Sequence, residues 1–283
     1  MFKIGLSTCG KVIDEALFRA YKDAGIAAME VSPERDEFES IDYKGIKMLS
    51  EKYNIDLWSF HLPFLPFKEI DASRRELQAH TVEYLGELIK KASDIGIERY
   101  VLHASGEPSE EEDRRELIDT AKETVYSLSQ IAKACGGCVA VESLPRTCIG
   151  RTSAELLELL SADDSVGVCF DTNHLLIESH KDFIKAVGNR IVTTHISDYD
   201  FINERHWLPG EGKTDWQSLI KDLNDSGYNG VWMYEIGFKC PANIIRNRDL
   251  TCEDFANNAR ELFEGKKPTI FSEPKPGLGF SNK

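Results

Sequence analysis

The sequence has no run of about 18 consecutive apolar residues, the length that a helix needs to cross a bilayer. It also begins without the basic and then apolar leader that is typical of a secreted protein. Its first residues, Phe2 to Ser7, instead follow the pattern of a strand. We therefore expect a soluble protein of the cytoplasm with no membrane partner.

Basic residues are fewer than acidic ones: 34 Lys and Arg stand against 48 Asp and Glu, and the formal net charge is −14. Proteins that coat DNA or anionic lipid rely on a positive surface field, so this balance argues against a nucleic acid partner. It leaves room for a local basic cleft. Proline and glycine are also few, at 10 and 20 of 283 residues, and hydrophobic residues make up 41%. That composition excludes disordered and collagen-like classes and indicates an ordinary globular protein.

The seven cysteines are scattered along the chain, and several lie inside apolar runs such as residues 166–170. Cys135 and Cys138 form a CxxC pattern, but no second pair or nearby histidine completes a zinc site. We interpret the cysteines as buried free thiols.

Short runs rich in β-branched residues alternate with longer helical patterns, and the alternation occurs eight times. The clearest helix is expected at residues 77–95, where apolar residues recur every three or four positions and Gly96 follows as a C-terminal cap. Thr152 and the pair Thr214–Asp215 are expected to begin two later helices. The predicted strands cover residues 2–7, 27–31, 56–61, 100–103, 139–142, 166–171, 191–196 and 230–236.

Eight β-then-α units within residues 1–264 predict the α/β class and a single-domain (β/α)8 TIM barrel. A doubly wound sheet also alternates, but it typically carries a glycine-rich phosphate turn after its first strand. Residues 7–11 have no such glycine pattern. Residues 265–283 are rich in Pro, Gly, Ser and Lys, so we expect a C-terminal extension there, loosely held or packed on the flank of the barrel.

Acidic and imidazole side chains stand at the C-terminal ends of the third to the eighth predicted strand. In a barrel these ends meet at one mouth, so we expect the six side chains to converge. Side-chain alternation also points Ala140 and Cys169 inward, and their small size leaves room for a ligand. The six residues are His61, His103, Glu142, Asp171, His195 and Glu235.

Glu142, Asp171, His195 and Glu235 form a candidate metal site. No Lys or Arg stands among them, so the buried carboxylates would repel one another unless a cation lay at their centre. This mostly oxygen-donating set suits Mn²⁺, our first choice, and also Mg²⁺ or Co²⁺, with Zn²⁺ as a further alternative.

The same strand ends and their flanks resemble the xylose isomerase-like barrel superfamily, which includes sugar-phosphate isomerases, ketose 3-epimerases, inosose dehydratases and endonuclease IV. The resemblance covers residues 2–264. It implies that Glu142, Asp171, His195 and Glu235 are the metal ligands and that His174 binds a substrate oxygen beside the metal. The segments that carry it are VESLP at 141–145, FDTNH at 170–174, THISD at 194–198, HWLPGEG at 206–212, DW at 215–216 and YEI at 234–236.

By this resemblance the chain is a divalent-metal-dependent isomerase or epimerase of a small-molecule sugar, sugar phosphate or cyclitol. A metal on the carbonyl and hydroxyl oxygens of a ketose acidifies the carbon between them. Glu142 and Glu235 would be the catalytic pair that removes and returns the proton through a metal-stabilised enediolate. Isomerisation, epimerisation and dehydration all begin in this way, so the sequence does not separate them. The superfamily also implies a homo-oligomer, either a dimer or a tetramer.

Other residues are candidates for binding substrate. Arg146 follows Glu142 by four residues, where it either anchors hydroxyl or phosphate groups or is a solvated loop charge. His61 and His103 would line the pocket, and His206 lies in the loop after the seventh strand. Glu30 ends the second strand, where it would either touch substrate or pair with a neighbouring loop.

The alternative is an endonuclease IV-like enzyme that cleaves DNA at abasic sites. That family holds three metals, and this chain has donors at the corresponding positions, among them His61, His103 and His206, with Glu204 where the family has Asp. The flanks of His61 and Glu235 and the acidic net charge favour the sugar enzymes. A third class, a barrel that only binds a sugar or metal, would leave the acid–base pair without use.

Overall fold

The computed structural model describes residues 2–64 and 67–277. Its centre, within these residues, is an eight-stranded parallel sheet in the order β7-β6-β5-β4-β3-β2-β1-β8. The residue after β7 pairs with β8 and closes the sheet into a barrel, because the Ile196 N–H donates to the Met233 carbonyl at 2.8 Å. The first and last residues of each strand lie within two residues of the predicted bounds. The strands are β1 Lys3–Ser7, β2 Ala28–Val31, β3 Asp56–His61, β4 Arg99–Leu102, β5 Cys138–Glu142, β6 Gly167–Asp171, β7 Ile191–His195 and β8 Val231–Tyr234.

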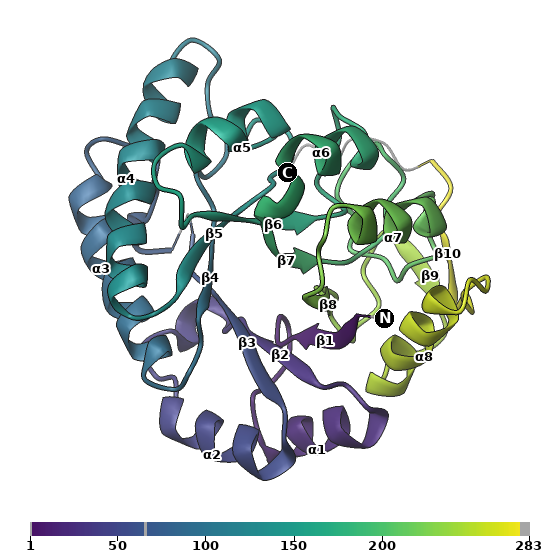
Figure 1. The fold of residues 1–283 in the computed structure, drawn as a ribbon. Coiled ribbons are helices and arrows are strands. Elements are labelled where there is room, and N and C mark those ends of the chain that lie inside the picture. Colours follow the sequence, from purple (N-terminus) through teal and green to yellow (C-terminus); the bar gives the residue numbers. More distant parts are fainter. Residues whose placement is uncertain (1, 65–66, 278–283) are drawn as a thin grey trace.

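Helices follow the strands and form a ring around the barrel (Figure 1). The predicted (β/α)8 barrel is therefore confirmed. Among the described residues, three 3-10 turns accompany the helices: η1 Arg35–Glu37, η2 Phe67–Glu69 and η3 Gly188–Arg190. The helices are α1 Glu15–Ala24, α2 Tyr43–Tyr53, α3 Gln78–Ser93, α4 Arg114–Ala134, α5 Ser153–Leu160, α6 His180–Val187, α7 Trp216–Asp225 and α8 Cys252–Phe263.

Local capping residues set several helix ends as expected. The Thr152 hydroxyl accepts from the Glu155 N–H at the start of α5, and Asp215 accepts from the Ser218 N–H at the start of α7. Helix α3 ends two residues before the predicted boundary, and Gly96 then takes a φ of 92°. Glycine adopts this left-handed backbone without steric strain, which lets the chain turn into β4.

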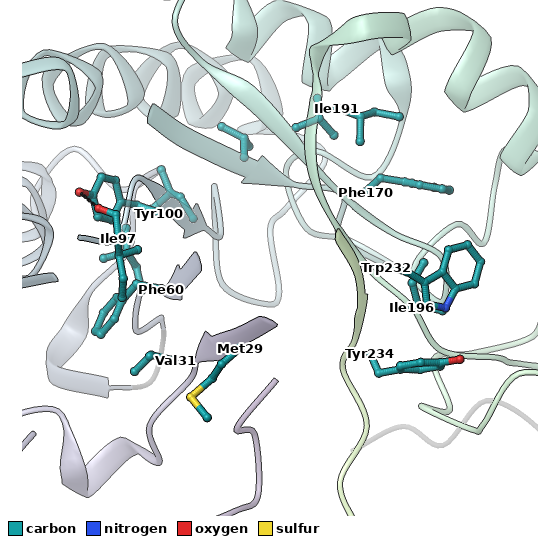
Figure 2. Packing of buried hydrophobic residues seen from close by; sticks show 14 of the residues in the cluster. Met29, Val31, Phe60, Ile97, Tyr100, Phe170, Ile191, Ile196, Trp232 and Tyr234 are labelled. Carbon is teal, nitrogen blue, oxygen red and sulfur yellow. Dashed lines mark hydrogen bonds between the residues drawn. The ribbon is translucent and has the colours of Figure 1, made fainter. Parts of the chain in front are cut away.

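Outward-facing strand residues fill the layer between the barrel and the helices. Phe170 of β6 stacks on Phe183 of α6 with ring centroids 5.2 Å apart. Phe60, Tyr100 and Trp232 are wholly buried in the same layer (Figure 2). This continuous apolar layer fixes the strands, and so it fixes the positions from which the polar side chains project.

Inward-facing residues are small where the barrel interior is narrow. Ala140 and Cys169 pack against Val101 inside the barrel, as the alternation predicted. At Gly167 a Cβ atom would lie 2.5 Å from Val192 Cγ1, closer than real atoms approach, so a larger residue does not fit without movement. An apolar floor therefore lies below the polar mouth.

Part of the C-terminal segment packs beside the barrel. Strand β10, Ser272–Pro274, pairs antiparallel with β9, Ile244–Arg246, which lies between β8 and α8 in the chain. The division of the chain at residue 264 stays a prediction, and residues 278–283 of the expected extension lie outside the described residues. No helix in the described ranges is both long and apolar enough to cross a membrane.

Candidate active site

The ends of strands β3 to β8 bring the six predicted polar side chains together at one mouth of the barrel. Four of them, Glu142, Asp171, His195 and Glu235, form what we call the buried quartet. One ligand atom from each lies within 4.8 Å of the others. His195 Nδ1 is 3.2 Å from Glu142 Oε1 and 3.4 Å from Glu235 Oε2. The side chain of Glu235 is 13% exposed, whereas the other three are almost wholly buried.

The donors of the buried quartet fit a divalent cation. Asp171 Oδ1 accepts from the Asn173 N–H at 2.6 Å, but its buried Oδ2 has no hydrogen-bond partner among the described residues. Such an oxygen is costly to bury unless a positive charge or proton lies beside it. Three carboxylates and one imidazole are also the hard, oxygen-rich set that Mn²⁺ and similar ions accept.

Burial and crowding divide the carboxylates into two kinds. Burial, together with the Glu142 and Asp171 carboxylates, raises the pKa of Glu235 to about 7 against the opposing charge of His195. Burial likewise raises the pKa of Asp171 to about 6, although His174 opposes it. Burial opposes ionisation of Glu142 too, yet the surrounding imidazoles of His195 and His103 hold its pKa well below the usual range. Without a cation, Glu142 thus stays ionised, whereas Asp171 and Glu235 take up a proton more readily than ordinary carboxyl groups do.

His61 and His103 both face the second oxygen of Glu142. Their Nε2 atoms lie 3.3 Å and 3.0 Å from Glu142 Oε2. Burial alone would lower the pKa of His61, but its hydrogen bond to Glu142 and the charge of that carboxylate raise it to about 9. Phe64 stacks on His103 with centroids 3.9 Å apart. Glu142 is therefore the acceptor around which several predicted site histidines gather.

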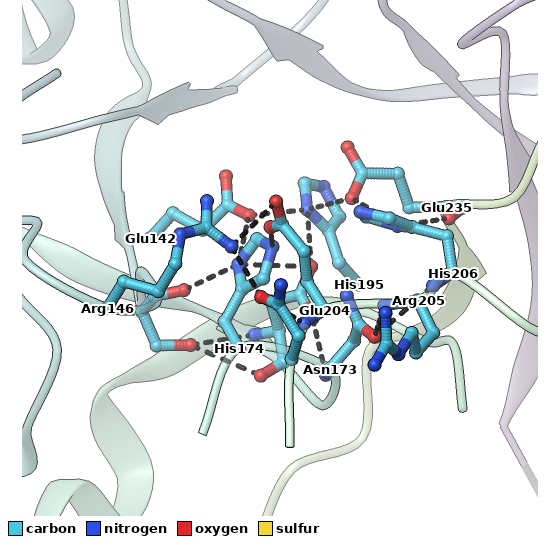
Figure 3. Close-up of polar contacts among 12 residues, drawn as sticks. Glu142, Arg146, Asn173, His174, His195, Glu204, Arg205, His206 and Glu235 are labelled. Carbon is cyan, nitrogen blue, oxygen red and sulfur yellow. Dashed lines mark hydrogen bonds and ion pairs between the residues drawn. The ribbon is translucent and has the colours of Figure 1, made fainter. Parts of the chain in front are cut away.

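His174 and His206 lie on the outer side of the quartet with Glu204 (Figure 3). His174 Nδ1 bonds the Ser143 carbonyl at 2.9 Å, and its Nε2 is 3.2 Å from Glu204 Oε2. His206 Nδ1 lies 3.3 Å from the Glu235 carbonyl oxygen. The structure therefore places these two of the four predicted substrate-binding histidines at the mouth, within reach of a molecule above the quartet.

Two buried polar side chains shape the long loop after β7 that carries Glu204 and His206. Asn173 Oδ1 accepts from the N–H groups of Arg205 and His206, at 2.7 Å and 3.2 Å. Asp198, wholly buried, accepts four backbone N–H groups and the Trp216 indole N–H. The loop is thus fixed from inside by acceptors for otherwise unpaired donors.

Arg146 is a bridge between loops. Its guanidinium bonds both carboxylate oxygens of Glu107, after β4, and the Asn203 and Glu204 side chains, after β7. Its backbone φ of 49° lies in the left-handed region, so the neighbouring loops hold it in a strained conformation. Of the two expected roles, the solvated loop charge does not describe it, because two acids and an amide surround the guanidinium.

A cavity of about 640 Å³ lies above the buried quartet, lined by His61, His103, Glu142, His174 and Glu235 and by the Arg146 bridge. A second cavity of about 600 Å³ shares Arg35, His61, Phe64 and Glu235 with it. Volumes of this size accommodate small molecules. Most residues that line the first cavity are charged or polar, and Phe64, Leu144 and Pro145 add apolar surface.

The sequence profile described as "Xylose isomerase-like TIM barrel" matches residues 18–252. The chain belongs to this family. An uncharacterized protein of Methanocaldococcus jannaschii is 26% identical to this chain over 200 residues, which cover 66% of this chain and 68% of that protein. Fructoselysine 3-epimerase of Escherichia coli O157:H7 is 33% identical over 54 residues, covering 19% of this chain and 20% of that enzyme.

Solved structures of the xylose isomerase-like fold superpose on most of the chain. A D-tagatose 3-epimerase-like protein gives a TM-score of 0.77, covers 93% of this chain and 96% of its own, and is 19% identical in sequence. At this identity the similarity establishes the shared fold.

The structure gives two residues partners that the sequence did not predict. Glu30 was expected to touch substrate or pair with a loop, but its carboxylate bonds His195 Nε2 at 3.0 Å and the Ser59 hydroxyl at 2.8 Å. Glu107 was not singled out as a candidate, yet its carboxylate pairs with Arg146. The position of Glu30 near the end of a strand was the sequence signal that could have pointed to its contact. No local sequence pattern indicates the contact between Glu107 and Arg146.

Replacing Asp198 with Ala should lower the free energy of unfolding by about 3–5 kcal/mol, because it leaves several buried donors without an acceptor. Asp215→Ala is a matched control in the same segment; it removes one helix cap and should cost about 1 kcal/mol. Urea unfolding of both variants measures the difference, and equal losses would contradict the role given to Asp198.

Proposed function

We propose that the protein is a divalent-metal-dependent isomerase or epimerase of a sugar, sugar phosphate or cyclitol, acting by proton transfer. The observation that carries this proposal is the placement of Glu142 and Glu235 in one buried quartet at the floor of a small-molecule cavity. The names of its relatives, a fructoselysine 3-epimerase and a D-tagatose 3-epimerase-like protein, support the same class. A cytoplasmic location and a homo-oligomeric state stay predictions.

Glu142, Asp171, His195 and Glu235 would hold the metal, for which we expect Mn²⁺. When bound, a divalent cation draws electron density from the oxygens of an α-hydroxy ketone and makes the adjacent C–H acidic. The protein's own contribution is to hold the three carboxylates and the imidazole in place before substrate arrives.

Glu142 and Glu235 would carry the proton. Glu142 ends β5 and Glu235 follows β8, and their carboxylates lie 3.2 Å and 3.4 Å from His195 Nδ1. A substrate carbon above the quartet would then have one carboxylate available to remove its proton and another to return one. Glu235 faces the cavity, so it can exchange a proton with solvent between turnovers. Glu142 is buried under His61 and His103, which hold its second oxygen.

His61, His103, His174 and His206 would bind substrate hydroxyls from the rim of the cavity. Arg146 would act at the same rim with its charge already balanced by Glu107 and Glu204. A guanidinium in this state can donate to a hydroxyl group, but a phosphate would have to compete with two acids. We therefore favour an uncharged sugar or cyclitol at this position.

Asp171→Asn should weaken binding of Mn²⁺ by about tenfold or more, because the amide removes one anionic oxygen from the buried quartet. Metal content after dialysis and Mn²⁺ titration measure the change. Asp163→Asn, on the opposite end of the barrel, is the control. Undiminished metal content in a variant that lacks both Asp171 and His195 would contradict the site.

Glu142→Gln and Glu235→Gln should each slow exchange of a substrate C–H proton with solvent deuterium by about 100-fold or more, because an amide cannot carry the proton. D-tagatose and fructoselysine, incubated with Mn²⁺-loaded enzyme in D₂O, are the probes, and mass spectrometry measures the deuterium. Glu51→Gln, on the surface of α2, is the control. Product that forms without deuterium would contradict proton transfer and require a hydride shift.

One observation favours a second candidate, an endonuclease IV-like enzyme. Beside the buried quartet, the described residues form two further donor groups, His61–His103–Glu142 and His174–Glu204–His206. Such an arrangement would suit phosphodiester cleavage with three ions. We rank it second because the rim is acidic and the Arg146 guanidinium is already paired, which leaves little attraction for a phosphate backbone.

Metal counting separates the two candidates. A sugar enzyme should hold about one ion per chain, and a triple variant of His61, His103 and His206 to Ala should keep it. For the wild type and the triple variant, mass spectrometry measures the metal content, and cleavage of a DNA duplex with one abasic site is measured on the same samples. A fall from three ions to one with loss of cleavage would establish the nuclease instead.

A further inference from the structure

Glu30 lies behind His195 in the wall of the barrel. It is the penultimate residue of β2, no part of it is exposed, and its Oε2 is 3.0 Å from His195 Nε2. The hydroxyl of Ser59, on the neighbouring strand β3, donates to the same oxygen at 2.8 Å. The β2–β3 pairing shifts register between Met29 and Glu30, directly before this side chain. Glu30 is therefore a built-in acceptor for one edge of the imidazole.

The other edge of the His195 ring faces the carboxylates. Its Nδ1 lies 3.2 Å from Glu142 and 3.4 Å from Glu235, with Asp171 Oδ2 at 3.9 Å. When the neutral imidazole keeps its proton on Nε2 for Glu30, its lone pair lies on Nδ1. Nδ1 is then the nitrogen that can bind a cation. Turning the ring over would put C–H groups against Glu30 and leave that buried carboxylate without its strongest donor, which is costly.

We propose that Glu30 is a positioning residue that fixes the orientation and the tautomer of His195, so that Nδ1 is the nitrogen presented to a divalent cation. The inference rests on the metal site of the proposed function. Glu30 does not itself complete the metal site, because the imidazole separates it from the other carboxylates and it belongs to none of the donor groups found among the described residues. A carboxylate that accepts the Nε2 proton also makes the opposite nitrogen a better ligand.

Two variants of Glu30 test this role in the full chain. Glu30→Ala removes the acceptor and should weaken binding of Mn²⁺ by roughly 10- to 100-fold. Glu30→Gln keeps an oxygen that can accept from Nε2 but loses the charge, so its loss should be smaller. Ser59→Ala is the matched control, because it removes the other bond to the same oxygen and should leave the affinity near that of the wild type. Each affinity is measured by titration with Mn²⁺, in which the electron paramagnetic resonance signal reports the free ion.

A spectroscopic measurement separates positioning from a general loss of stability. In the metal-free, ¹⁵N-labelled protein, the hydrogen-bonded Nε2–H of His195 should give a downfield proton signal, which is identified by its loss in His195→Asn. We expect the signal in the wild type, Ser59→Ala and Glu30→Gln, and its loss in Glu30→Ala.

Wild-type affinity in Glu30→Ala, or a persistent Nε2–H signal there, would overturn the role of Glu30 while leaving the proposed function intact. If Glu30→Ala does not fold, Glu30→Gln decides the question, and unchanged affinity in that variant would overturn the role. A wild-type protein that binds no Mn²⁺ would reject the proposed function and this role with it.

Discussion

Repulsion among three buried carboxylates is the constraint on which the mouth of this barrel depends. Glu142, Asp171 and Glu235 converge where solvent cannot screen them, so each needs positive charge or a proton nearby. Histidines supply it in the metal-free protein: both oxygens of Glu142 face imidazoles. A divalent cation would meet the same need from the centre. The ring of histidines and the proposed metal site therefore have one electrostatic cause.

The rest of the structure keeps these groups from moving apart. The apolar layer between strands and helices fixes the strand ends, and the small inward residues close the floor below them. Above the floor, Asn173 and Asp198 hold the loop after β7 through its backbone N–H groups. Because these acceptors are buried, the loop positions Glu204 and His206 without any help from substrate. Preorganisation of this kind is what proton transfer between fixed groups requires.

Much of this arrangement follows from the sequence, because it depends on periodicity. The alternation of strands and helices predicted the barrel, and the period of two along β5 and β6 predicted that Ala140 and Cys169 face inward. The convergence of the six strand-end residues then followed from the fold alone. Contacts between loops were beyond this reasoning. The Glu107–Arg146 pair and the Glu30–His195 bond join segments 39 and 165 residues apart, and no local pattern encodes either one.

The pairing of Arg146 also bears on what the cavity can select. Two carboxylates neutralise the guanidinium, and His206 at the rim is 39% exposed and close to solvent. Glu107 and Glu204 would repel a ligand that brought its own negative charge to the Arg146 side of the cavity. A ligand with hydroxyl groups meets no such barrier, since hydroxyls both donate to carboxylates and accept from imidazoles. The same acids that hold the loops together thus favour neutral, hydroxyl-rich molecules above the buried quartet.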